Sequence, residues 1–119
     1  MARIVVLDDD ETLLALMRTM IEEAGHTAVS AGALEDLEPG TTADVVVTDL
    51  IPLKAYDGAK ARDWIARLRR RFSAPLIVVT AHAGALAEPD RLGADAVVGK
   101  PFDLDEMSAL IERHLDRPA

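Results

Sequence analysis

The sequence contains no cysteine, and this absence excludes disulfide bonds, thiolate metal ligands and a cysteine nucleophile. Long hydrophobic runs are also missing, because uninterrupted apolar stretches reach only about five residues, against the roughly 20 that a membrane-spanning helix needs. The start of the chain, Met1-Ala2-Arg3, runs into acidic residues too soon for the hydrophobic region of a secretory signal. These absences predict a soluble, cytoplasmic protein without thiol redox chemistry.

Positive charge is scarce as well. The 13 lysine and arginine residues face 21 aspartate and glutamate residues, which gives a net charge of −8. A chain this acidic has no general attraction to nucleic acid or to an anionic membrane surface, so we expect neither as a direct partner. An acidic binding site on such a chain would instead recruit cations.

Short apolar runs alternate with segments of helical period five times along the chain, without an internal repeat. At 119 residues the chain is long enough for one domain with its own core and too short for two. The predicted strands are roughly residues 3–7, 27–31, 44–48, 75–80 and 95–98, and the long helices include residues 58–71, which bury Trp64, and 104–115. Right-handed crossovers then give an α/β fold with one parallel sheet and helices on both of its faces.

Two of the connecting helices are expected to be short. Residues 33–38 leave room for only a brief second helix before Pro39-Gly40. The fourth helix lies between Thr80 and Gly93, and Pro89 limits it to about two turns. The first helix, by contrast, has a full-length pattern that stops at a glycine.

Polar residues stand where the predicted strands end. Asp8 and Asp9 follow the first strand, Asp49 follows the third, Thr80 ends the fourth and Lys100 comes just after the fifth. Each residue alone has an ordinary explanation, such as a loop acid or a solvated lysine. Open parallel sheets, however, hold their ligands at the carboxyl ends of the strands, and acids gathered there repel one another unless a cation compensates. The combination therefore predicts a binding site.

Four short motifs carry these residues in a particular order. They are Arg3-Ile4-Val5-Val6-Leu7-Asp8-Asp9-Asp10, then Asp49-Leu50 with Pro52 and Asp57-Gly58, then Val78-Val79-Thr80-Ala81, and last Gly93-Ala94-Asp95 leading to Lys100-Pro101-Phe102. Together they resemble the receiver domain of bacterial two-component response regulators, over nearly the whole chain. The resemblance implies a flavodoxin-like, doubly wound (βα)5 fold with the sheet order 2-1-3-4-5, as in the chemotaxis regulator of that family. It also implies one receiver domain over residues 1–119, with no output domain in this chain.

The resemblance implies a phosphorylation site at Asp49. This residue would accept a phosphoryl group from the phosphohistidine of a sensor histidine kinase or of a phosphotransfer protein, forming an aspartyl phosphate. One Mg²⁺ would be held by Asp8, Asp9, Asp49 and the backbone carbonyl of Ile51. A domain of this kind assists its own phosphorylation and dephosphorylation and is not a turnover enzyme.

The same resemblance assigns roles to the residues after the fourth and fifth strands. The side chains of Lys100 and Thr80 and the N–H of Ala81 would bind phosphoryl oxygens. The peptide bond before Pro101 would be cis, which sets the reach of the lysine. Output would pass through a protein surface that changes on phosphorylation, toward an unknown downstream protein.

The chain departs from the family pattern around the site. Pro52 lies three residues after Asp49, where the family has a proline four residues after, so the loop is rebuilt. Ile51 and His82 occupy positions that influence how long the phosphate persists. Val97 stands where the family has an aromatic residue that swings inward on activation. We therefore expect the acceptor chemistry to be retained and the output to proceed without an aromatic rotamer switch.

Two alternative functions start from the same residues. The pattern Asp8-x-Asp10-x-Thr12 after an apolar strand resembles the first motif of haloacid-dehalogenase-type phosphatases, with Asp8 as the nucleophile. That family needs a further acidic pair after its lysine and leaves Asp49 unexplained. The other alternative is a receiver-like module that takes no phosphate and works only by docking. For the receiver itself, the family resemblance implies that partners dock on the first helix near Leu14 and Arg18 together with the loop after the fifth strand.

Overall fold

The structure is a computed structural model that describes residues 2–115, and strands and helices alternate along it. The strands are β1 (Arg3–Leu7), β2 (Thr27–Ala31), β3 (Val45–Thr48), β4 (Leu76–Thr80) and β5 (Ala96–Gly99). The helices are α1 (Glu11–Glu23), α2 (Gly58–Arg71), α3 (Ala83–Ala87) and α4 (Leu104–Leu115), with 3₁₀ turns η1 (Leu34–Asp36) and η2 (Pro89–Arg91). The observed strands start and end within one residue of the predicted ones. No helix in this described range is both long and apolar enough to cross a membrane.

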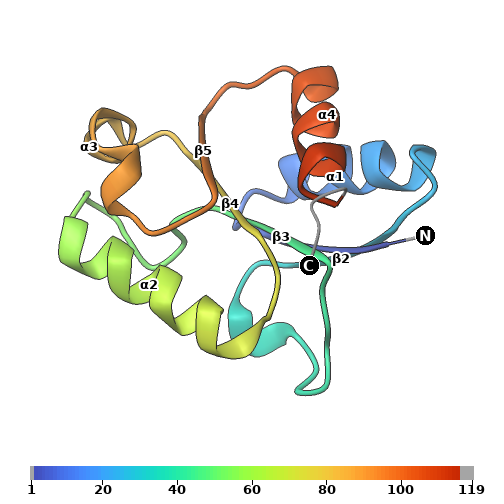
Figure 1. The fold of residues 1–119 in the computed structure, drawn as a ribbon, viewed down its shortest axis with the longest axis horizontal. Helices are drawn as coiled ribbons and strands as arrows, with labels where there is room; N and C mark the ends of the chain where they lie inside the picture. The colour runs from blue at the N-terminus through green and yellow to red at the C-terminus, as the bar shows by residue number, and fades with distance from the viewer. Residues whose placement is uncertain (1, 116–119) are drawn as a thin grey trace.

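The five strands form one parallel sheet in the order β2-β1-β3-β4-β5 (Figure 1). This order confirms the predicted flavodoxin-like α/β fold. The register places Leu7 beside Thr48, and Thr80 beside Gly99, so β1, β3, β4 and β5 end near one another. Because the strands are parallel, the residues that follow them gather at one edge of the sheet.

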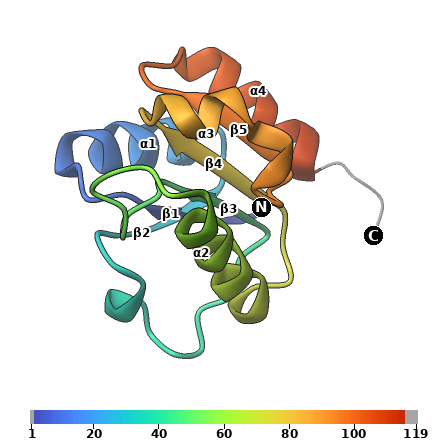
Figure 2. The same cartoon turned by 90° about the vertical axis from the view of Figure 1, so that its left-hand side faces the viewer.

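The sheet has a hydrophobic layer on each face, because alternate side chains of a strand point in opposite directions. Val5 and Leu7 belong to a core shared with α2 and α3, whereas Ile4 and Val6 belong to a core shared with α1 and α4. Figures 1 and 2 show α1 and α4 together on one side of the sheet and α2 on the other. Burial on both faces explains why the central strands are almost purely apolar.

The prediction of a short second α-helix at residues 33–38 is wrong, since these residues contain only the 3₁₀ turn η1. Two local features stop a helix here. Ala33 stands at the N-cap position without a side-chain acceptor for the first N–H groups, and Glu38 precedes Pro39, a position where helical backbone is disfavoured. Leu37 is still buried against the core on the α2 side. A single turn therefore covers the part of the sheet where a short helix was expected.

The helices next to the carboxyl edge have well-defined ends. The carboxylate of Asp10 accepts hydrogen bonds from two N–H groups in the first turn of α1, and Asp57 does the same for α2. At its other end α1 stops at Glu23, and Gly25 follows just after the C-cap with a φ of +89° that suits glycine, which confirms the predicted stop. The capping residues Asp10 and Asp57 end the loops that follow β1 and β3, so hydrogen bonds hold the end of each loop to the helix after it.

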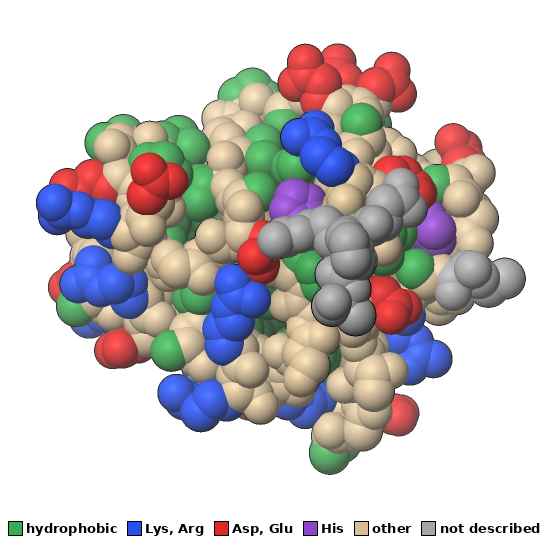
Figure 3. Space-filling view, in the orientation of Figure 1, with side chains coloured by type: hydrophobic (Ala, Val, Ile, Leu, Met, Phe, Trp, Pro, Cys, Tyr) green, Lys and Arg blue, Asp and Glu red, His purple; other side chains and the backbone are tan. Residues whose placement is uncertain are grey.

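The basic residues are concentrated on α2. This helix carries six of the 13 lysine and arginine residues and a single acid, a net charge of +5, whereas the rest of the chain has a net charge of −13. Arg67 pairs with Glu35 at 2.7 Å and Arg69 with Asp95 at 3.0 Å. Figure 3 shows lysine and arginine side chains gathered at the lower left, where α2 runs in Figure 1. The helix is thus a basic strip on an acidic molecule.

Candidate functional site

Three carboxylates meet at the carboxyl edge of the sheet. Asp8 and Asp9 follow β1 and Asp49 follows β3, and one oxygen from each lies within 4.8 Å of the other two. Asp8 is only 2% exposed, Asp49 is half-buried and Asp9 is exposed. The fold thus brings together the three acids that the sequence analysis singles out.

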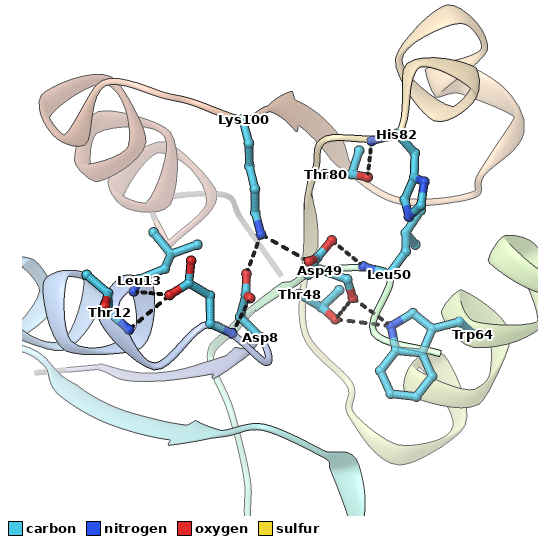
Figure 4. A network of polar contacts seen from close by, with 11 residues as sticks. Asp8, Thr12, Leu13, Thr48, Asp49, Leu50, Trp64, Thr80, His82 and Lys100 are labelled. Atoms are coloured by element: carbon cyan, nitrogen blue, oxygen red, sulfur yellow. Dashed lines mark hydrogen bonds and ion pairs between the residues drawn. The ribbon is translucent and has the colours of Figure 1, made fainter. Parts of the chain in front are cut away.

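Lys100 places its ammonium group between two of these acids. Its Nζ donates to Asp8 Oδ2 at 2.8 Å and to Asp49 Oδ2 at 3.0 Å (Figure 4). Its backbone N–H donates to the carbonyl of Thr80 at 2.9 Å, so the start of the side chain is fixed by the end of β4. The Lys100–Pro101 peptide bond is cis. The lysine charge offsets the repulsion between the two carboxylates that it joins.

Burial and ion pairing act against each other in this cluster. Burial raises the pKa of Asp8, and the hydrogen bonds that it accepts from Lys100 and from the Asp10 N–H do not offset this rise. Burial works to lower the pKa of Lys100, but the hydrogen bonds to Asp8 and Asp49 outweigh it and the pKa is raised. The result is a firmly charged lysine beside an acid that holds its proton more tightly than usual. A further cation would lower the pKa of Asp8 again, which suits the cluster to a metal ion.

Binding of a divalent cation to this cluster is expected to weaken as the pH falls through the raised pKa of Asp8. A metal ion needs the deprotonated carboxylate, and the folded protein takes up this proton at a higher pH than an aspartate with the ordinary value of 3.8. The free energy of unfolding of the metal-free protein changes with pH in the opposite direction to the metal affinity. Because the pKa of Asp8 is higher in the folded chain than in the unfolded chain, this free energy of unfolding falls as the pH rises between the two pKa values. Calorimetric Mg²⁺ titrations at a series of pH values check this, and an affinity that stays constant down to pH 3.8 would contradict it.

Hydrogen bonds fix both the backbone and the carboxylate of Asp49. Its N–H donates to the Leu7 carbonyl at 2.8 Å. Its carbonyl accepts from the Thr48 hydroxyl at 2.7 Å and from the indole N–H of Trp64 at 3.2 Å. Its Oδ1 accepts the Leu50 N–H at 2.7 Å, while Oδ2 faces the lysine (Figure 4). The carboxylate therefore has a set orientation at the edge of the sheet.

Thr48 and Trp64 are two residues of this network that the sequence does not single out. The pattern on α2 predicts Trp64 in the core, and the structure confirms it, with the side chain 5% exposed. Thr48 is completely buried at the end of β3. A buried indole N–H needs a hydrogen-bond acceptor, so a tryptophan predicted in the core also predicts a polar group beside it. Here that group is the end of β3 at Thr48 and Asp49.

Thr80, Ala81 and His82 form the turn from β4 into α3. Thr80 is completely buried, and its hydroxyl oxygen accepts the N–H of His82 at 3.0 Å. Ala81 is exposed. Figure 4 shows Thr80 at the same end of the sheet as Lys100 and Asp49. The turn thus stands at the predicted edge, with the threonine hydroxyl bound inside it.

The loop after β3 packs against this turn. Ile51 is half-buried against the core on the α2 side, and the Tyr56 ring centroid lies 6.2 Å from that of His82. Gly84 makes room for the tyrosine, because a Cβ at this position would lie 2.3 Å from Cδ2 of the ring. Val97 of β5 is half-buried in the same core. The aromatic ring beside the turn therefore comes from the rebuilt loop and not from β5.

The donor set suits a hard divalent cation. Mg²⁺ prefers oxygen ligands and is commonly held by a few carboxylates together with water and phosphate oxygens. Asp8, Asp9 and Asp49 offer three such oxygens within reach of one ion. The Asp49 carboxylate belongs to this cluster and also accepts a hydrogen bond from Lys100, so it has the partners that a carboxylate nucleophile needs in phosphoryl transfer.

A parallel α/β sheet with this arrangement at its carboxyl edge defines the class of domains that accept a phosphoryl group on a carboxylate. The chain belongs to the response regulator receiver domain family, whose model matches residues 4–112. It is therefore a phosphoacceptor domain of two-component signalling and not an enzyme of sustained turnover, which confirms the class predicted from the sequence. Membership implies a histidine kinase as partner, and the acidic cluster is consistent with the Mg²⁺ site of receivers.

Two curated relatives illustrate the match. The chain is 30% identical to the transcriptional regulatory protein YxdJ of Bacillus subtilis, over 98% of the chain and 52% of that protein. It is 37% identical to the transcriptional regulatory protein TcrA of Mycobacterium tuberculosis, over 90% of the chain and 43% of that protein. The chain thus spans about half the length of these relatives. Their names give no support to the finer likeness to a chemotaxis regulator.

Solved structures agree with this assignment. The non-phosphorylated HemR receiver domain from Leptospira biflexa is 28% identical, with a TM-score of 0.74 over 100% of this chain and 99% of that one. A response regulator from Thermotoga maritima reaches a TM-score of 0.80 at 18% identity, over 98% of each chain. At that identity the second likeness shows the fold alone.

Proposed function

We propose that Asp49 is the phosphoacceptor of this receiver domain. The observation that carries the proposal is the position of its carboxylate, which lies in the acidic cluster and has one oxygen on Lys100 and the other on the Leu50 N–H. In the reaction, the bond between phosphorus and the imidazole nitrogen of a phosphohistidine breaks. A new bond forms between phosphorus and a carboxylate oxygen of Asp49, and the histidine of the kinase or phosphotransfer protein leaves.

Mg²⁺ is the cation that we propose for the acidic cluster. Asp9 and Asp49 would hold it directly, Asp8 largely through water, and the backbone carbonyl of Ile51 would complete the protein's share. The bound ion would neutralise the charge of an incoming phosphoryl group. The acids of this chain do the positioning, because two of them lie at the end of one strand and the third at the end of its neighbour.

Lys100, Thr80 and Ala81 are proposed to bind the transferred phosphoryl group. The ammonium group already lies beside Asp49 and can contact a phosphoryl oxygen as a point charge. The Thr80 hydroxyl accepts the His82 N–H and keeps its own proton available to donate to a second oxygen, together with the Ala81 N–H. Ile51 and His82 are proposed to modulate the lifetime of the phosphate, since both stand in the two loops that border it.

The signal is proposed to leave through a protein surface that depends on phosphorylation, in a cytoplasmic setting. Val97 replaces the usual aromatic switch, and the ring of Tyr56, from the loop after β3, packs beside the β4–α3 turn, so output would not use an aromatic rotamer in β5. The relatives named above are transcriptional regulatory proteins. By analogy, we propose that signalling through this receiver acts on transcription through a downstream protein, without direct contact between the receiver and nucleic acid.

Incubation with Mg²⁺ and acetyl phosphate tests the proposal. We expect one phosphoryl adduct by intact mass, absent when EDTA removes the metal, and borohydride reduction followed by peptide mapping should place it on Asp49. No adduct and no released phosphate would favour a docking-only module. An adduct on Asp8 with continuous release of phosphate would favour the phosphatase alternative.

A further inference from the structure

We propose that Trp64 is a positioning residue for the phosphorylation of Asp49, an inference that rests on Asp49 being the acceptor. Trp64 lies on α2, yet its indole N–H reaches the end of β3, where it lies 3.2 Å from the Asp49 carbonyl and 3.1 Å from the Thr48 hydroxyl oxygen (Figure 4). The Thr48 hydroxyl in turn donates to the same carbonyl at 2.7 Å. The backbone of the acceptor residue is thus held by a side chain from another element.

One rigid peptide group connects this contact with the reacting carboxylate. The carbonyl of Asp49 and the N–H of Leu50 belong to a single planar unit. Its carbonyl end is held by Trp64 and Thr48, and its N–H end donates to Asp49 Oδ1 at 2.7 Å. The direction of that N–H, and so the orientation of the carboxylate, follows from where the carbonyl is anchored.

The indole is itself held in place. Trp64 is 5% exposed and packs in the core on the α2 side. The guanidinium carbon of Arg67 lies 5.7 Å from its ring centroid, and Arg67 pairs with Glu35 at 2.7 Å. A buried ring with one N–H donor on a capped helix is a fixed donor, and fixed donors preserve the reactive orientation of a group more effectively than mobile ones.

The variant Trp64→Phe keeps an aromatic ring in the core and removes the N–H donor. With saturating Mg²⁺ and acetyl phosphate, we expect its phosphorylation rate to fall about three- to tenfold, the scale of one lost hydrogen bond. Ile65→Val is the matched control, because Ile65 is also buried on α2 and has no polar side-chain atom. Its rate should stay close to that of the wild type.

Thr48→Val provides a second test through coupling. Both Thr48 and Trp64 donate to the Asp49 carbonyl, so the effects of Thr48→Val and Trp64→Phe on the rate should not multiply when the two are combined. If the two rate reductions do multiply in the double variant, the two residues act on different parts of the site, and the proposal is overturned.

A spectroscopic measurement on the unaltered chain tests the contact itself. Because the chain has one tryptophan, its indole N–H gives one signal in a ¹H–¹⁵N spectrum. Beryllofluoride, which mimics a phosphoryl group, should shift this signal in the wild type with Mg²⁺ and leave it unchanged in Asp49→Asn. A wild-type signal that stays in place while the adduct forms would count against the proposal.

The outcomes separate the inference from the function on which it rests. If the wild type forms no adduct on Asp49, the proposed acceptor is wrong. If the wild type is phosphorylated there and Trp64→Phe reacts at the same rate, the acceptor stands and the positioning role fails. Equal slowing by Trp64→Phe and Ile65→Val would also overturn the role, since it would show a general loosening of α2. Slowing by Trp64→Phe alone supports it.

Discussion

Replacing Asp49 with asparagine is expected to abolish phosphorylation. Asparagine has the same shape and can still accept the Leu50 N–H through its side-chain oxygen, but a neutral amide is not a nucleophile for phosphorus. We expect the rate of adduct formation with acetyl phosphate and Mg²⁺ to fall by at least about a thousandfold, which is the scale of the loss when an enzyme loses its nucleophile. Intact mass recorded over a time course measures the loss.

Asp63→Asn is the matched control for this experiment. Asp63 is an exposed acid on α2, so its replacement changes the net charge by the same amount without removing a ligand or a nucleophile. This variant should be phosphorylated like the wild type. An adduct that forms on Asp49→Asn at the wild-type rate would place the acceptor elsewhere, and Asp8 would then be the first candidate.

Replacing Asp8 with asparagine should weaken Mg²⁺ binding by about 10- to 100-fold, the usual cost of losing a group that orients the ligands of a metal. The change removes one of the three negative charges in the cluster and exchanges a carboxylate oxygen for an amide. Thermal unfolding with and without Mg²⁺ measures the effect. At 100 times its dissociation constant, a ligand adds about 2.7 kcal/mol to the free energy of unfolding, and between about half and five-sixths of this gain should vanish in the variant at the same concentration of Mg²⁺.

Asp10→Asn controls for a change of charge in the same loop. The Asp10 carboxylate caps α1 and accepts the Thr12 N–H at 3.0 Å, a task that asparagine performs about equally well. Its Mg²⁺ affinity should remain near that of the wild type. Equal affinities in Asp8→Asn and the wild type would exclude Asp8 from the metal site.

The fold was predictable because the sequences of the central strands are those of strands buried on both faces. Runs such as Ile4-Val5-Val6-Leu7 and Leu76-Ile77-Val78-Val79 are apolar at every position, which only a sheet covered on both faces requires. The same runs identify the site, since they stop at polar residues and parallel strands stop at one edge. The pairing of β1 with both β2 and β3 is a different matter, because it came from family resemblance and not from hydrophobic pattern.

What the sequence did not reveal depends on contacts between distant residues. The missing second helix reflects a weak start at Ala33 and a proline after Glu38, which together outweigh a pattern of adequate length. The role of Trp64 required knowing that α2 crosses the end of β3 at the level of Asp49. The sequence pattern predicts that a tryptophan is buried, but it does not predict which group accepts the hydrogen bond of the indole N–H.

The basic strip of α2 makes the molecule electrically two-sided. Across the sheet from it, α1 and α4 together carry six acidic and two arginine residues. Glu35 and Asp95 offset part of the charge of the strip by pairing with Arg67 and Arg69, and the helices on the two faces of the sheet still differ in the sign of their net charge. Such a dipole experiences a torque in the field of a charged protein at distances up to roughly a Debye length, about 8 Å at physiological salt. An acidic surface turns α2 toward itself and a basic surface turns it away. The charge of a partner thus biases which side it meets first, and added salt weakens that preference.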